Sequence, residues 1–223
     1  MNDFIREVKE KLNNLEMTSN GEHIKTIEVR KLSSKLYKEL DDKSKENVFN
    51  KCSELLEQHN WAMGVIAYDF AYRVRKQYDE DTFSIFESWL IKYVCGWGDC
   101  DDFCTHAFGD LIIQKPELIA KIKLWTERKD FWMRRAAAVI LIPSIQKDSY
   151  GEVYATEIAD LLMNDENILV LKGYGWMLKV LSTKKPDKVY NYLVRNKEIM
   201  PRVSFRYATE KMDRNMKKEL MKL

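Results

Sequence analysis

The chain has 223 residues, of which 45% are apolar and 32% charged, a composition typical of a soluble globular protein with enough material for a core. Only 8 Gly and 4 Pro residues are present, which leaves little room for a turn-rich, all-β design. The net charge of +2 does not by itself indicate a nucleic-acid-binding protein. However, the segment from Arg195 to Leu223 holds nine Lys/Arg against four Asp/Glu, a net of +5.

The sequence carries no sign of a membrane segment or a secretion signal. No apolar run approaches the roughly 20 residues needed to cross a bilayer, and the N-terminal Met1–Phe4 has neither a basic nor an apolar signal region. We therefore expect a cytoplasmic protein without membrane association, with four reduced cysteines: Cys52, Cys95, Cys100 and Cys104. The last three, together with His106, match no zinc-binding spacing, so we expect no metal and no cofactor.

Apolar residues recur every three to four positions along most of the chain, which predicts helices. Before residue 60 this pattern includes Phe4, Val8, Leu12 and Leu15, and then Val29, Leu32, Leu36 and Leu40. Beyond residue 60 we expect helices at about 62–77, 82–93, 101–114, 116–127, 131–146, 152–163, 168–182 and 186–195, and a last one from about Pro201. Pro143 lies late in its segment and should end or kink that helix.

The expected helices form pairs in series. Successive pairs begin near residues 61, 99, 131, 167 and 201, a spacing found in helical repeat proteins with two helices per unit. We therefore predict an all-α fold, a curved α-solenoid that forms a single domain over residues 1–223 and lines a concave face with one row of helices. A compact, non-repeating helical bundle is the alternative.

Trp97 and Asp101 stand four residues apart at the start of one expected helix. If that helix begins at or before Gly98, both side chains point to the same side. The alternative is that Asp99 or Asp101 caps the helix while Trp97 packs in the core. Asp102 adds a third carboxylate within four positions.

Arg134 and Arg135 lie early in a segment that turns apolar at once. Two charges there indicate an exposed helix end, where guanidinium groups and backbone N–H groups can hold an anion such as a phosphate. The alternative is a surface ion pair with Glu127 or Asp130.

Lys172, Trp176 and Lys179 fall on one side of another expected helix, and a flat ring between ammonium groups suits a nucleic-acid backbone. A tryptophan on a helix is also a common core residue. Gly173 and Gly175 each cost the helix about 1 kcal/mol relative to Ala, so close helix packing or a closely approaching ligand must offset them. The cations of the last helix form either a solvated face or a phosphate-binding edge: Arg202, Arg206, Lys211, Arg214, Lys217 and Lys218.

From about Ile24 to Met212 the chain resembles the DNA alkylation repair glycosylases of the AlkD type, which are built from HEAT-like helical repeats. Ile24–Arg30 is similar to an early segment of that family, and Trp97 with Asp101 is similar to its Trp-x-x-x-Asp pair. Trp132–Ala137 resembles its Trp-x-x-Arg-Ala-Ala stretch, which places Arg135 rather than Arg134 at the functional arginine.

Two further stretches carry the resemblance. Lys172–Lys179 is similar to the family's Lys-Ala-x-Gly-Trp-x-Leu-Arg stretch, and Arg206–Ala208 is similar to a late Arg-x-Ala element. The chain departs from the family at Gly173 and Tyr174, where Ala and an aliphatic residue are usual. It also lacks an aromatic residue at Leu15–Asn20, where the family's N-terminal helices bring one toward the lesion.

The resemblance implies a monomeric enzyme that hydrolyses the N-glycosidic bond of cationic N3- and N7-alkylpurines in duplex DNA. Asp101 would stabilise the oxocarbenium-like sugar and orient water, and Trp97 and Trp176 would flank the deoxyribose. Family members of this type capture the lesion without flipping the base into a pocket. The implied DNA contacts are Arg135, Arg134, Lys172, Lys179 and Arg206.

Two other functions remain open at this point. One is a non-catalytic HEAT-like module that binds DNA, in which the tryptophans and arginines serve phosphate and shape recognition. The other is a helical-repeat scaffold whose concave face binds a peptide or a helix of another protein.

Overall fold

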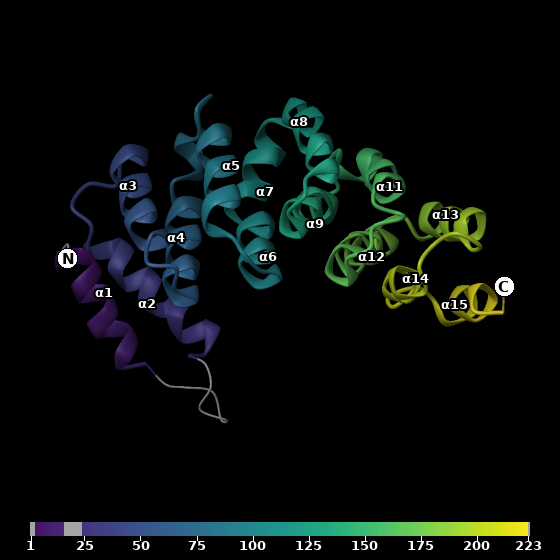
Figure 1. Ribbon diagram of the computed structural model, residues 1–223, viewed down its shortest axis with the longest axis horizontal. Helices are drawn as coiled ribbons and strands as arrows, with labels where there is room; N and C mark the ends of the chain where they lie inside the picture. Colours follow the sequence, from purple (N-terminus) through teal and green to yellow (C-terminus); the bar gives the residue numbers. More distant parts are fainter. Residues whose placement is uncertain (1–2, 16–23, 223) are drawn as a thin grey trace. The chain divides into compact units, whose positions relative to one another are not determined.

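The structure, a computed structural model, describes residues 3–15 and 24–222 (Figure 1). The stretch Leu15–Asn20, where the family has an aromatic residue and this chain has none, lies outside the described part except for Leu15. Over the described ranges the chain forms helices and no strand, which confirms the predicted all-α helical repeat fold. The chain divides into two compact units, Met1–Val94 and Cys95–Leu223.

The first unit is built around α4. This helix is buried along most of its length, and α2 and α3 both pack against it. Ser44 and Asn60 cap α3 and α4 by accepting hydrogen bonds from the backbone N–H groups of Asn47 and Met63, which fixes where these helices begin. The helices of this unit are α1 (Asp3–Asn13), α2 (Thr26–Glu39), α3 (Lys45–Leu56), α4 (Trp61–Arg73), the 3₁₀ turn η1 (Arg75–Gln77) and α5 (Thr82–Tyr93).

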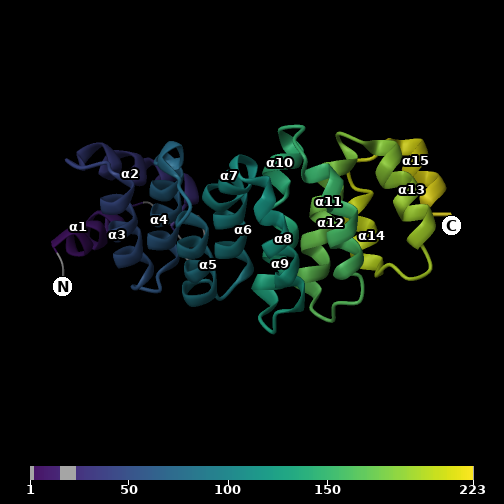
Figure 2. The ribbon, with the colours of Figure 1, turned by 90° about the horizontal axis from the view of Figure 1, so that it is seen from above.

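In the second unit, four helices pack in a row: α6 against α9, α9 against α12, and α12 against α14. Figure 2 shows α9, α12 and α14 running side by side. The helices in chain order are α6 (Trp97–Thr105), α7 (Ala107–Gln114), η2 (Pro116–Leu118), α8 (Ile119–Lys123), η3 (Leu124–Glu127), α9 (Phe131–Val139), α10 (Ile142–Gln146), α11 (Gly151–Leu161), α12 (Ile168–Ser182), α13 (Pro186–Asn196), α14 (Arg202–Ala208) and α15 (Arg214–Leu220).

The helices of the row begin at Trp97, Phe131, Ile168 and Arg202, close to the predicted pair starts at 99, 131, 167 and 201. The row is therefore the series of first helices of consecutive pairs. The bounds predicted for 82–93 and 168–182 coincide with α5 and α12. Among the described residues, no helix is long and apolar enough to cross a membrane.

Two predicted helices are each interrupted in the structure. The helix expected over 101–114 begins four residues earlier, at Trp97, and breaks at His106, which has non-helical φ and ψ of −123° and −98°. The helix expected over 131–146 breaks between Val139 and Ile142, just before Pro143. The second break is the one expected from Pro143, because proline has no N–H to donate to the Val139 carbonyl and its ring clashes with that carbonyl.

The glycines of α12 are explained by close helix packing. A Cβ atom at Gly175 would lie 2.8 Å from Cβ of Tyr207 and 3.0 Å from the backbone oxygen of Ser204, both on α14. In the same region the Ser204 hydroxyl donates a hydrogen bond of 2.9 Å to the Leu171 carbonyl. The close contact between α12 and α14 thus requires a residue without a side chain at position 175.

Replacing Gly175 with Ala should therefore destabilise the protein, even though Ala favours helices. We expect Gly175→Ala to lower the free energy of unfolding by about 1–3 kcal/mol, because overpacking pushes α14 away from α12. Gly64, inside α4, is the matched control: a Cβ there would meet Tyr68 at 3.7 Å, an ordinary contact. Gly64→Ala should raise stability by up to about 1 kcal/mol. Urea unfolding measures both, and equal or greater stability of Gly175→Ala would contradict the packing account.

Candidate functional site

The row of helices in the second unit brings together residues that are far apart in the sequence. A cavity of about 330 Å³ lies here, which we call the tryptophan pocket. Its size falls in the range of small-ligand sites. Of the predicted site residues, Trp97, Arg135, Lys172, Trp176 and Lys179 line it. Leu169 and Tyr207 complete the lining.

The position of Trp97 decides between its two interpretations. Trp97 is the first residue of α6 and is 56% exposed, so it does not pack in the core. The N-cap residue of α6 is Gly96, and neither Asp99 nor Asp101 occupies the capping position. The capping and core-packing alternative is therefore wrong, and Trp97 offers its ring to the pocket. Trp176 is half-buried on α12 and lines the same pocket.

The three neighbouring carboxylates have different surroundings. Asp101 accepts two hydrogen bonds from Arg135, each 2.7 Å long. One oxygen of Asp102 lies 3.3 Å from Nδ1 of His106. Burial raises the pKa of the Asp99 carboxyl, and the nearby charge of Asp102 raises it further. Asp101 is thereby joined to Arg135, which lines the tryptophan pocket.

Arg135 is buried, contrary to the expectation that it would lie on an exposed helix end. Its Nε and Nη2 atoms donate to the two oxygens of Asp101, and Nη1 donates to the Leu169 carbonyl. Burial alone would lower the pKa of Arg135, but hydrogen bonding to Asp101 and its charge outweigh burial and raise that pKa. A guanidinium has five N–H donors, so two remain beyond the three used here.

Gly173 gives the Arg135 side chain its space. A Cβ atom on Gly173 would lie 3.0 Å from Cγ and 3.2 Å from Nη1 of Arg135. The two glycines of α12 thus make room for two different neighbours: Gly175 for α14, and Gly173 for the guanidinium that holds Asp101. Both positions show close packing, one of the two reasons expected for glycines in this helix.

Arg134 points away from the pocket. Its Nε donates to Asp165 at 2.5 Å, and its Nη1 donates to the backbone carbonyls of Arg128 and Lys129. The proposed surface pair with Glu127 or Asp130 is therefore replaced by a pair with Asp165, whose side chain is only 6% exposed. Arg134 thus joins the start of α9 to the segment before α12. Its contact with DNA stays a prediction, and these internal partners do not favour it.

The remaining predicted cations differ in their surroundings. Lys179 forms an ion pair of 3.1 Å with Glu210 and lies over the Tyr207 ring. Lys172 lines the tryptophan pocket and also a neighbouring cavity, which Arg206 lines as well.

The sequence prediction missed Tyr207 and Leu169, although Tyr207 lies inside the quoted stretch Arg206–Ala208. Within the described part of the chain, no group of three or more His, Cys, Asp or Glu residues is arranged to hold a metal ion.

Comparison with known proteins finds a matching family and a solved structure of similar fold. A protein family described as "DNA alkylation repair enzyme" has a sequence model that matches residues 22–212 of this chain. A solved structure described as "Predicted DNA alkylation repair enzyme from Enterococcus faecalis" superposes with a TM-score of 0.69 at 18% sequence identity, over 94% of this chain and 92% of that chain. At that identity the likeness shows a shared fold. No curated protein gives a significant match.

The contact between Arg135 and Asp101 should be sensitive to the shape of the cation. We expect Arg135→Lys to lower the free energy of unfolding by about 1–3 kcal/mol, because one ammonium cannot replace the paired hydrogen bonds to Asp101 and the bond to Leu169. Arg128→Lys is the control, because Arg128 is exposed and its contact with Asp130 is long, at 4.0 Å. This substitution should change the free energy of unfolding by less than about 0.5 kcal/mol. Equal effects of the two substitutions in urea unfolding would contradict the assigned role of Arg135.

Proposed function

The chain belongs to the family of DNA alkylation repair enzymes, and from this premise we propose that it is a DNA glycosylase. It hydrolyses the N-glycosidic bond of cationic N3- and N7-alkylpurines in duplex DNA. Alkylation already makes such a purine a cationic leaving group, so the enzyme needs no acid to protonate it. The chemical demand falls instead on the sugar, which acquires positive charge as the bond to the base breaks.

The observation that carries this proposal is the tryptophan pocket. It places an exposed ring, Trp97 of α6, and a half-buried ring, Trp176 of α12, around one cavity. The faces of indole rings attract a cation, and two such rings beside a deoxyribose favour the charge that develops on it. Flat rings also stack on sugars and bases without regard to sequence, which suits an enzyme that acts at any alkylated purine.

Asp101 is the carboxylate proposed to act on the sugar. Its side chain is 17% exposed, and Arg135 holds both oxygens in one orientation. A carboxylate fixed in this way stabilises the oxocarbenium-like transition state electrostatically and orients the attacking water without reorganising during the reaction. Arg135 acts as a positioning residue for Asp101, and its two further N–H groups can bind a phosphate of the lesion strand.

The lysines of α12 supply the charge that attracts DNA to the pocket. Lys172 and Lys179 both line the tryptophan pocket, on the helix that carries Trp176. Phosphate contacts of this kind position the duplex but carry no sequence information. They fit recognition of a lesion by its charge and local shape rather than by surrounding bases.

Trp97 gives a direct test because its exposure separates function from folding. We expect Trp97→Ala to slow the release of methylated purine from alkylated duplex DNA by at least about tenfold, because a loss of about 1.4 kcal/mol of cation stabilisation lowers a rate tenfold. The same substitution should change the free energy of unfolding by less than about 1 kcal/mol. Trp61→Ala is the matched control, since Trp61 is 40% exposed on α4 and lies outside the pocket. Chromatography of the released bases measures the release by both variants, and urea unfolding measures their stability.

The outcomes separate the three candidate functions. Release by the wild type that Trp97→Ala loses and Trp61→Ala keeps supports the glycosylase. No release by the wild type, with salt-sensitive binding to duplex DNA, would favour the non-catalytic DNA-binding module. Neither release nor DNA binding at low salt would favour the protein-binding scaffold.

A further inference from the structure

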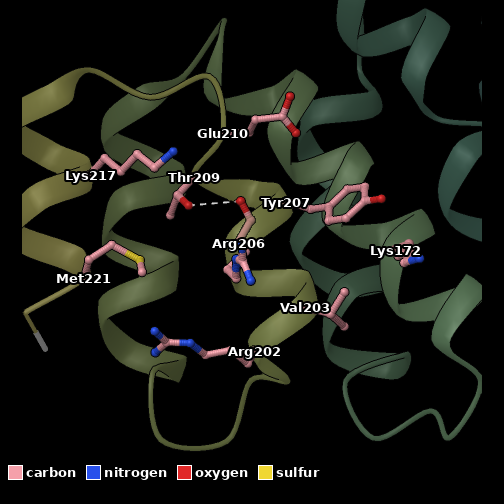
Figure 3. Close-up of a pocket in the computed structure, with 9 residues that line it drawn as sticks. All are labelled: Lys172, Arg202, Val203, Arg206, Tyr207, Thr209, Glu210, Lys217 and Met221. Carbon is pink, nitrogen blue, oxygen red and sulfur yellow. Dashed lines mark hydrogen bonds between the residues drawn. The ribbon is translucent and has the colours of Figure 1, made fainter.

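Tyr207 of α14 lies at the border between two cavities. It lines the tryptophan pocket and also the neighbouring cavity of about 750 Å³ beside α14. Figure 3 shows its ring extending away from Arg206 toward the side where Lys172 lies, and Lys172 lines both cavities as well. The ring is half-buried, so part of it faces whatever occupies the pocket.

The Tyr207 ring is held in place by contacts with α12. The backbone of α12 lies against its first carbon, because a Cβ atom at Gly175 would be only 2.8 Å from Cβ of Tyr207. The ammonium of Lys179 lies 5.6 Å from the ring centroid, and its charge is balanced by Glu210 at 3.1 Å. A ring fixed in this way loses little freedom when a ligand binds beside it.

The Tyr207 hydroxyl has a chemical property that the other side chains of the pocket lack. Among the residues that line the tryptophan pocket, the arginine, the two lysines and the two tryptophans only donate hydrogen bonds, whereas a tyrosine hydroxyl also accepts them. Within the described part of the chain, this hydroxyl makes no hydrogen bond with the protein. It can therefore accept a hydrogen bond from a ligand that offers an N–H group.

An N7-alkylguanine offers such a group at the edge beside its sugar. Its N2 amino group lies in the minor groove, where adenine presents only acceptors. The positive charge of the alkylated ring makes this amino group a stronger donor than that of undamaged guanine. The cations of the pocket, in contrast, repel a cationic base. Direct recognition of the base thus falls on the neutral acceptor.

We propose that Tyr207 is a specificity-determining residue, whose hydroxyl accepts a hydrogen bond from the N2 amino group of an N7-alkylguanine at the tryptophan pocket. This inference rests on the proposed function, in which the tryptophan rings flank the deoxyribose of the lesion. The base edge beside that sugar faces the minor groove, whereas the N6 amino group of adenine lies in the major groove. The site therefore favours lesions derived from guanine over those derived from adenine.

This hydrogen bond acts on binding rather than on the rate of cleavage. The base leaves as a neutral alkylguanine, so its amino group is a better donor in the bound substrate than in the transition state. Loss of such a contact raises the concentration needed for half-saturation and leaves the saturated rate unchanged. Tyr207 thereby differs from Asp101, whose loss should lower the saturated rate.

The test removes the hydrogen bond from each side in turn. Tyr207→Phe removes the hydroxyl and keeps the ring, and a duplex with N7-methylhypoxanthine in place of N7-methylguanine lacks the amino group but keeps the cationic purine. Single-turnover release is measured over a range of enzyme concentrations. On the N7-methylguanine duplex we expect Tyr207→Phe to raise the half-saturating concentration about fivefold, at an unchanged saturated rate. On the N7-methylhypoxanthine duplex it should change neither value.

Tyr190→Phe is the matched control, because Tyr190 on α13 donates to Glu219 at 3.1 Å and does not line the pocket. It should leave both values unchanged on both duplexes, and urea unfolding checks that both variants remain folded. The proposal is overturned if Tyr207→Phe raises the half-saturating concentration equally on the two duplexes, raises it on neither, or lowers the saturated rate.

The proposal and the proposed function can fail separately. A fluorine atom at C2′ of the damaged nucleotide disfavours positive charge on the sugar, so binding of the same two bases can be measured without release. If the wild type releases neither base, the glycosylase assignment fails. Fluorescence anisotropy then still tests Tyr207, which should bind the fluorinated N7-methylguanine duplex about fivefold more weakly as Phe. If the wild type releases both bases and Tyr207→Phe keeps its half-saturation, the glycosylase assignment stands and the role of Tyr207 fails.

Discussion

The candidate site depends on the paired hydrogen bonds between Arg135 and Asp101. They join α9 to α6, and the bond from Arg135 to the Leu169 carbonyl joins both to α12. Because the two tryptophan rings lie on α6 and α12, the same guanidinium that orients the carboxylate also ties together the helices that carry the rings. Breaking such a buried pair costs about 3–5 kcal/mol. Gly173 leaves room for this contact, since a Cβ atom there would lie 3.0 Å from Cγ and 3.2 Å from Nη1 of Arg135.

A second contact extends the site toward the end of the chain. Gly175 lets α14 approach α12, and this brings Tyr207 to the tryptophan pocket and Arg206 to the neighbouring cavity. One helix, α12, therefore serves both cavities, through Lys172 in each. Asp101 itself does not line the tryptophan pocket, but Arg135, which does, holds both of its oxygens.

The sequence was sufficient to predict the helical repeat, because the apolar period and the spacing of pair starts survive in α6, α9, α12 and α14. It also singled out Trp97 and Trp176, but only through the stretches that resemble those of a known family, because their spacing alone left core packing open. It failed where partners come from other repeats. Nothing near Arg135 in the sequence indicates that it is buried against Asp101, and nothing near Arg134 points to Asp165. Such tertiary pairs have no local period, so they become visible only once the helices are packed.

Asp101, held by Arg135, is the carboxylate that the proposed mechanism requires for bond cleavage. The most direct test is single-turnover release of methylated purine by wild type, Asp101→Asn and Asp102→Asn at saturating enzyme, with unfolding and duplex binding measured alongside. We expect Asp101→Asn to remain folded, bind the duplex and lose at least about 10²-fold in rate, as removal of a preorganised electrostatic group does. Asp102→Asn should stay within a few-fold of wild type. A folded Asp101→Asn that releases purine at the wild-type rate would contradict this mechanism.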